Sequence, residues 1–244
     1  MIVDPSLLQQ FAPSGVLRAS LNMGNPVLAH SRTASEKPAG VSIDLARRLG
    51  RELGVPVELL EFATAARSVE ALAAGDADIG FMAIDPQRAG SIHFTAAYVQ
   101  IEGSYLVPLD STITSNEQVD EPGIRIMVGA GSAYELYLTR TIKHARIVKV
   151  STSEAVVDAM LEDKVPVAAG VRQQLEADAR RVGGVRVLDG RFMVINQAMA
   201  MPKGRSEQAQ AYLAAFVERM KRDGVVAEGL AQHGIEGAKV APAA

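Results

Sequence analysis

The sequence contains no cysteine and no tryptophan, and only 5% of its residues are aromatic. The lack of cysteine excludes disulfides, thiolate metal sites and a cysteine nucleophile. The few aromatic rings, a net charge of −3 and the lack of a basic stripe argue against a nucleic-acid partner. What remains is a chain of 244 residues, 48% of them hydrophobic, which suffices for one large domain or two smaller ones.

Long apolar runs are missing as well. No stretch approaches the ~20 residues that span a bilayer. The first residues, MIVDPSLLQQ, lack the cationic and apolar segments of a signal peptide. We therefore expect a chain that is not inserted in a membrane. It would be cytoplasmic if complete as given, and periplasmic if its start was re-engineered.

Signatures of metal sites and of common enzymes are also absent. The histidines are His30, His93, His144 and His233. They stand too far apart for metal-ligand spacing, and no P-loop or G-x-S-x-G motif occurs. Asp76 and Asp78 are better explained as the polar start of a strand than as a catalytic pair. We expect no metal, no cofactor and no catalytic residue.

Short apolar segments alternate with helical patterns along the chain. The expected strands are rich in Val, Ile and Leu and mostly apolar on both faces, as in parallel sheets covered on two sides. They span 17–21, 57–62, 79–82, 124–128, 147–150, 165–169, 185–188 and 192–199.

Helical segments lie between these strands. One begins at Ser42 as N-cap and stops at Gly54. Another begins with a capping box between Ser151 and Glu154. The helical period is clearest over 206–224, where the charges face away from the apolar side.

The order strand–helix–strand–helix–strand occurs twice, over about 17–82 and 124–169. Two such α/β units in tandem indicate two lobes. The extended segments 98–108 and 190–204 connect them, so that the chain crosses between the lobes twice. Two crossings suit a hinge with a cleft.

We therefore predict an α/β fold of two lobes, each a mostly parallel sheet flanked by helices. Residues 1–102 with 199–244 would form lobe 1, and residues 103–198 lobe 2. The hinge would lie near 100–106 and 194–200.

Arg88 is the first candidate site residue. It follows a strand and a turn at Asp85-Pro86, and ligands of α/β sheets bind outside the carboxyl ends of strands. A guanidinium there can hold a carboxylate through two parallel hydrogen bonds. The alternative is an ordinary solvent-facing arginine.

Three other strand ends carry polar groups. Gly131 and Ser132 open a helix, where backbone N–H groups and a hydroxyl form a ready anion site, although Ser132 as a simple N-cap is compatible with this. Arg172 stands at the head of a later helix and faces either a cleft or solvent. Asn22 and Asn25 are polar groups at the end of the first strand, by a Gly-Asn-Pro turn that asparagine favours without any ligand.

Three segments carry a resemblance to a known family. They are AGVSIDLARRLGRELG, LAAGDADIGFMAIDPQR and FTAAY. They match the patterns G-x-x-x-D-L-x-x-x-(L/I)-x-x-x-L-G, L-x-x-G-x-x-D followed by T-x-x-R, and F-S-x-P-Y. Over about 16–234 the chain thus resembles the family 3 solute-binding proteins that serve polar amino-acid ABC transporters. The resemblance implies the two-lobe, type II periplasmic-binding-protein fold.

The resemblance also implies roles for single residues. Arg88 matches the arginine that clamps the ligand α-carboxylate, and Ala83 stands where a Ser or Thr commonly donates to the same group. Gly131 and Ser132 match the G-S/T turn of the second lobe. Ala133 follows them, where a Thr is frequent.

The chain departs from the family at two places. Amino-acid binders have an Asp after the last crossover strand of lobe two to pair with the ligand ammonium, whereas residues 170–172 read Gly-Val-Arg. The aromatic residues that usually sandwich the ligand are replaced by Ala65 and Asn25. A buried ammonium without an anionic partner is costly, and Glu102 is the one nearby acid that we propose as a substitute.

We expect this protein to capture a small carboxylate-bearing metabolite, an amino acid or an organic acid, in an interlobe cleft. The function would be ABC-type transport, with a permease as partner. Arg88 and Arg172, together with their small neighbours, favour a small organic acid that has two anionic groups or a bulkier body. The alternatives are a cytosolic ligand sensor of the same fold and a cyclohexadienyl-dehydratase-like lyase, in which Glu102 would be the general acid.

Overall fold

The computed structural model describes residues 4–31 and 37–244. The chain divides into two compact units. The first unit extends to Gln100 and resumes at Asn196, and the second is Ile101–Ile195. The predicted hinge near the two changeover points stays a prediction.

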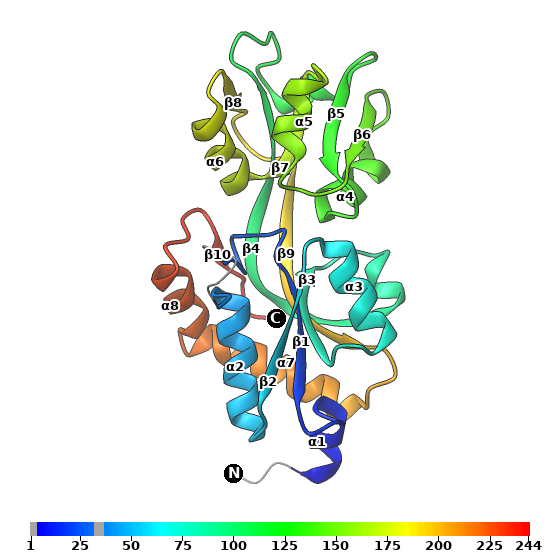
Figure 1. Ribbon diagram of the computed structural model, residues 1–244, viewed down its shortest axis with the longest axis vertical. Helices are drawn as coiled ribbons and strands as arrows, with labels where there is room; N and C mark the ends of the chain where they lie inside the picture. Colours follow the sequence, from blue (N-terminus) through cyan, green and yellow to red (C-terminus); the bar gives the residue numbers. More distant parts are fainter. Residues whose placement is uncertain (1–3, 32–36) are drawn as a thin grey trace. The chain divides into compact units, whose positions relative to one another are not determined.

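The first unit is built on strands in the order β2-β1-β3-β9, followed by β4, with β10 paired to β4 (Figure 1). Their bounds are β1 Leu17–Asn22, β2 Val57–Phe62, β3 Ile79–Ala83, β4 Ile92–Pro108, β9 Met193–Pro202 and β10 Lys239–Val240. Strand β1 runs parallel to β2 and β3, whereas β9 is antiparallel to β3. Because Ser20 pairs with Gly80, the carboxyl ends of β1 and β3 lie at the same edge of the sheet.

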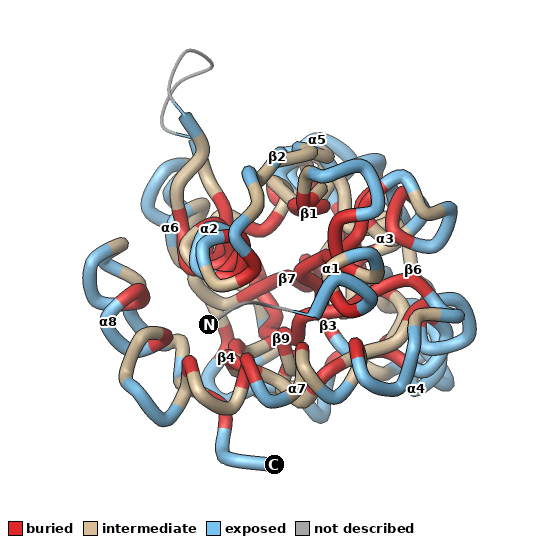
Figure 2. The backbone as a smooth tube through the Cα atoms, turned by 90° about the horizontal axis from the view of Figure 1, so that it is seen from below, coloured by how far each residue is buried: buried red, intermediate tan, exposed pale blue. Residues whose placement is uncertain are grey.

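Helices flank this sheet. They are α1 Pro5–Phe11, α2 Val41–Leu53, α3 Ala65–Ala74, the 3₁₀ turn η1 Arg88–Gly90, α7 Glu207–Arg222 and α8 Val225–Gln232. Helix α3 packs against β1 and β3, and α2 packs against α8. In Figure 2 strand β3 and most of β9 are red, hence buried, while the outward turns of the helices are pale blue. Leu72, Met82 and Ile92 belong to the core beneath α3.

The second unit has the strand order β4-β7-β5-β6, with β8 paired to β4. Its elements are η2 Asn116–Val119, β5 Arg125–Gly129, α4 Ala133–Thr141, β6 Arg146–Val150, α5 Val156–Glu162, β7 Val167–Val171, α6 Arg172–Val182 and β8 Val185–Val187. Strand β5 is parallel to β6 and β7, and β4 is antiparallel to β7. Met127, Val157 and Leu175 bring β5, α5 and α6 into one core.

The predicted class, mostly parallel sheets flanked by helices, is confirmed. The strand expected over 165–169 begins later, at Val167, because the N–H of Val165 bonds to the carbonyl of Met160 and ends the α5 turn. The crossing strand expected over 98–108 begins earlier, at Ile92.

The prediction for the start of α2 was wrong. Gly40 is the N-cap, and Ser42 lies inside the helix with only 2% of its surface exposed. Its hydroxyl is within 3.0 Å of the Tyr98 hydroxyl, so it satisfies a buried phenol instead of a helix end. Gly54 ends the helix as predicted, in the left-handed region at φ 72°.

The prediction of a capping box between Ser151 and Glu154 was also wrong. Helix α5 begins only at Val156, and the hydroxyl of Thr152 accepts from the N–H of Ala155 at 3.3 Å. Residues 151–155 form bends and turns, so the polar cluster that looked like a cap belongs to the loop before the helix.

Across 4–31 and 37–244, no helix has the length and apolar character to traverse a bilayer. The same residues hold no group of three or more His, Asp or Glu side chains that could bind a metal ion.

Candidate functional site

Arg88 is buried, with only 5% of its surface exposed, so the solvent-facing alternative was wrong. Its Nη1 donates to the carbonyl of Ala83 at 3.0 Å. The turn between them is fixed by Asp85, whose Oδ1 accepts from the N–H of Gln87 at 2.9 Å and whose carbonyl accepts from the N–H of Ala89. The end of β3 and the η1 turn thus set the position of the guanidinium.

Ala83 is the last residue of β3 and is 4% exposed. It offers no hydroxyl, and its carbonyl is occupied by Arg88. In the ladder it pairs with Gln197 of β9, a polar residue that is itself only 5% exposed. Sequence reasoning missed Gln197, although a glutamine within the apolar run VINQAMAM was a visible signal.

Asn22 and Asn25 occupy one turn at the end of β1. The Oδ1 of Asn22 accepts from the N–H of Gly24 at 3.1 Å, so turn chemistry accounts for this side chain. Asn25 differs, because it is 8% exposed and its Oδ1 has no hydrogen-bond partner among the residues that the structure describes. Buried acceptors are rarely left unbonded, and this one lies on the same sheet edge as the loop that carries Arg88.

In the second unit, Ser132 is the N-cap of α4, and its Oγ accepts from the N–H of Glu135 at 3.1 Å. Ala133 is the first residue of that helix. The N–H of Gly131 donates to Oε2 of Glu135 at 3.2 Å. The predicted anion-binding turn therefore already holds a carboxylate of its own chain.

Glu135 is 3% exposed and pairs with Lys149 at 2.7 Å. Burial alone would raise the pKa of its carboxyl. The bonds from Lys149, Thr139 and Gly131 outweigh burial and hold the pKa below the usual range.

Arg172 and Glu102 form an ion pair within the second unit. The Nε of Arg172 is 3.0 Å from Oε2 of Glu102, and Nη1 of Arg191 is 2.7 Å from Oε1. Arg172 also donates to the carbonyl of Gly190. The hydrogen bond from Arg191, with further help from Arg172, lowers the pKa of Glu102.

Both oxygens of Glu102 are therefore taken by arginines. The lowered pKa keeps Glu102 ionised, so it does not suit the role of general acid. Its charge is already neutralised by Arg172 and Arg191, so it does not suit the role of partner for a ligand ammonium either. Sequence reasoning missed Arg191, which no motif marked.

The predicted residues thus form two groups, one in each unit. In the first, Arg88 bonds to Ala83, while Asn22 and Asn25 share a turn at the same sheet edge. In the second, the loop before α4 holds Gly131 and Ser132, and Arg172 pairs with Glu102.

The model of the bacterial extracellular solute-binding proteins, family 3, matches residues 21–234. The chain belongs to this family. No curated protein matches the sequence.

Several solved structures share the fold at low sequence identity. A binding component of an ABC transporter from Wolinella succinogenes, complexed with lysine, is 22% identical, with a TM-score of 0.77 over 90% of this chain and 95% of that one. A solute receptor for L-cysteine from Neisseria gonorrhoeae is 21% identical, with a TM-score of 0.80 over 94% of each chain. An ancestral amino-acid-binding protein described as a precursor of cyclohexadienyl dehydratase is 22% identical, with a TM-score of 0.77 over 92% and 97%.

Proposed function

We propose that this family 3 protein captures a small metabolite with one carboxylate, an amino acid or a monocarboxylic acid, for ABC-type transport. The observation that carries the proposal is the burial of Arg88 at the carboxyl end of β3. A buried guanidinium in a fixed position suits planar recognition of a carboxylate. The family, the lysine complex of the Wolinella succinogenes protein and the L-cysteine receptor support the same ligand class.

Asn25 supports an additional polar contact. Its buried Oδ1 has no partner among the described residues and is suited to accept from an ammonium, amide or hydroxyl of the ligand. Arg172, by contrast, is paired with Glu102 and with the carbonyl of Gly190. This pairing favours a ligand with one carboxylate over the dianionic acid that two arginines suggested in the sequence.

Lyase activity has less support. It needs a protonated group near neutral pH, and the pKa of Glu102 is lowered. The similar solved structures are mainly binding proteins, although one is described as a dehydratase precursor. Turnover of prephenate that Glu102→Gln abolishes would reverse this judgement.

The test is native mass spectrometry of freshly purified protein, followed by denaturing extraction and identification of any released small molecule. We expect a carboxylic acid that is retained by the wild type and by Arg180→Ala, an exposed matched control on α6, and lost in Arg88→Ala. Retention in Arg88→Ala would contradict the proposal. Where the purified protein is empty, thermal-shift screening of amino acids and organic acids on the same variants replaces the extraction.

A separate experiment distinguishes transport from cytosolic sensing. Fractionation of cells that express the native gene should find the protein outside the cytoplasm if it serves a transporter. A wholly cytoplasmic location would favour the sensor.

A further inference from the structure

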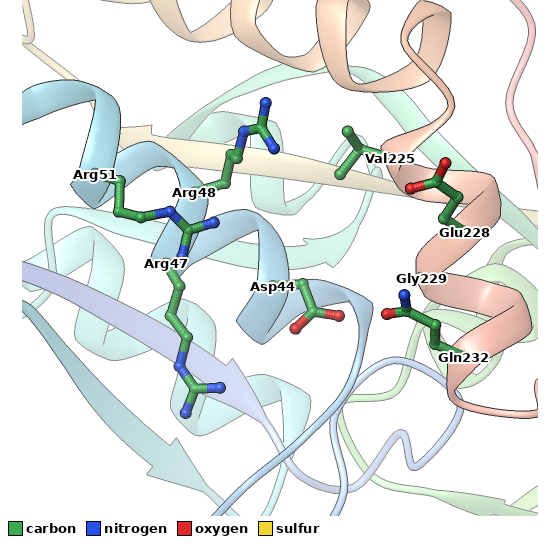
Figure 3. Close-up of a pocket in the computed structure, with 8 residues that line it drawn as sticks. All are labelled: Asp44, Arg47, Arg48, Arg51, Val225, Glu228, Gly229 and Gln232. Atoms are coloured by element: carbon green, nitrogen blue, oxygen red, sulfur yellow. The ribbon is translucent and has the colours of Figure 1, made fainter.

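A pocket of about 300 Å³ lies between α2 and α8 in the first unit (Figure 3). Two stripes of residues line it, each with the spacing i, i+3, i+4, i+7 of one helix face. They are Asp44, Arg47, Arg48 and Arg51 on α2, and Val225, Glu228, Gly229 and Gln232 on α8. None of these residues belongs to the predicted ligand site.

The pocket is held by specific contacts between the two helices. Oδ2 of Asp44 is 2.7 Å from Nε2 of His233, directly after α8. Gly229 is buried, and a Cβ at this position would lie 3.3 Å from Cγ2 of Val41. The missing side chain therefore allows the helices to approach closely beneath the pocket.

Positive charge gathers on the α2 wall. Within the described part of the chain, the side chains of Arg47 and Arg51 form no ion pair and no hydrogen bond, and like charges at i, i+4 disfavour a helix. Arg48 is 4.0 Å from Glu52, which lies closer, at 2.8 Å, to Arg219. Among the described residues, Arg48 thus has one distant ion-pair partner, and the side chains of Arg47 and Arg51 have none.

The opposite wall supplies polar groups. In Figure 3 Glu228 and Gln232 extend from α8 on the side facing α2, and Asp44 extends from α2. Val225 is the only apolar side chain of the lining, whereas protein segments usually dock through buried apolar or aromatic anchors. A small polar ligand fits this lining better than a protein segment.

We propose that this pocket is an accessory site for a small polyanion, a molecule with two or more carboxylate or phosphate groups. Arg47, Arg48 and Arg51 would bind the anionic groups by charge-assisted hydrogen bonds. Gln232 and Glu228 would meet hydroxyl groups of the same molecule. The site is separate from the carboxylate site at Arg88 and goes beyond the proposed function.

Isothermal titration calorimetry with citrate and with pyrophosphate tests the site. The ionic strength is held constant because exposed charges are screened by salt. Wild type and Arg88→Lys should both bind one equivalent, with a Kd of about 1 mM or tighter. Binding of citrate alone would identify a ligand with carboxylate groups, and binding of pyrophosphate alone a ligand with phosphate groups. Binding of both would show that the site recognises the negative charges that the two anions share.

Variants show whether the measured heat of binding comes from this pocket. The double variant Arg47→Gln/Arg51→Gln should bind at least about tenfold more weakly, and Glu228→Gln should bind more tightly because a negative charge is removed. Arg180→Gln is the matched control for loss of an exposed positive charge and should behave as wild type.

Three outcomes would overturn the proposal. They are no saturable binding of either anion up to about ten times that Kd, equal weakening in Arg180→Gln, and loss of binding in Arg88→Lys. The last would place the anion at the carboxylate site and would leave the proposed function intact.

Discussion

The guanidinium of Arg88 donates from Nη1 to the carbonyl of Ala83 at 3.0 Å, across the turn that joins β3 to η1. The last residue of a buried strand thus fixes the first residue of the next element. Arg88 is 5% exposed, so its charge acts in a medium where electrostatic interactions are stronger than in water. A ligand carboxylate would meet an arginine that is already oriented, which reduces the entropy lost on binding.

Arg88→Lys should weaken ligand binding about a hundredfold. Lysine keeps the positive charge but cannot offer the planar two-pronged donor of a guanidinium. The measurement is calorimetric titration of the ligand identified by mass spectrometry. The unfolding midpoint of the variant in urea, measured beside it, shows that the protein is still folded.

The conservative variant separates two ideas about Arg88. If charge alone holds the carboxylate, Arg88→Lys binds as wild type and the two-pronged contact is excluded. Exposed Arg180→Lys serves as the control and should leave the affinity unchanged.

The strands were predictable because their signal is local and strong. Val57–Phe62 and Ile79–Ala83 are short, mostly apolar runs ended by turns, and the strand over 57–62 was predicted to the residue. Caps were less predictable, since Ser42 and Ser151 have the right residue type at the wrong place. Tertiary contacts, such as the hydrogen bond between Ser42 and the distant Tyr98, determine which residues cap the helices.

For the candidate site, the sequence located residues but not their partners. Arg88 was found through a motif, whereas its burial depends on the packing of β3 and η1. The pairing of Glu102 with Arg191 joins residues 89 positions apart, and no local pattern encodes such a contact. The interpretation of Arg172 as a second ligand arginine ignored a carboxylate that only the fold brings to it.

Asp78→Ala should destabilise the protein by about 3–5 kcal/mol. Asp78 is fully buried, and its carboxylate accepts from the side chains of Arg18 at 3.0 Å and Arg205 at 3.1 Å. Removal of the acid leaves two partly buried guanidinium groups without their partner. Urea unfolding at neutral pH measures the loss.

Exposed Asp76 is the matched control, two residues away. Asp76→Ala should change the free energy of unfolding by no more than about 0.5 kcal/mol. Equal losses for the two variants would show that the ion cluster around Asp78 does not stabilise the fold.

The stability that Glu102 contributes should depend on pH. Its folded-state pKa is lowered by the hydrogen bond from Arg191, with further help from Arg172. Its contribution is therefore complete above pH 4.5, the ordinary value, and is lost as the pH falls through the lowered folded-state pKa. We expect Glu102→Gln to be less stable than wild type at pH 7 and the difference to shrink in acid.

Urea unfolding of both proteins over a series of pH values checks this. Glu154→Gln, at an exposed position, is the control and should show a small difference at every pH. A constant difference between wild type and Glu102→Gln across the acid range would refute the linkage.

Ser132→Ala should lower the free energy of unfolding by about 1 kcal/mol, because it removes the N-cap bond to the N–H of Glu135. Ser206→Ala is the matched control and should lower the free energy of unfolding by a similar amount, since Ser206 caps α7 through the N–H of Ala209 at 3.2 Å.

Ligand affinity then separates the two roles of Ser132. If its hydroxyl also binds the ligand, only Ser132→Ala weakens binding, whereas a Ser132 that serves solely as a cap leaves the affinity of both variants equal to wild type. Ser132→Asp adds a further test, because aspartate caps a helix well but would repel a carboxylate.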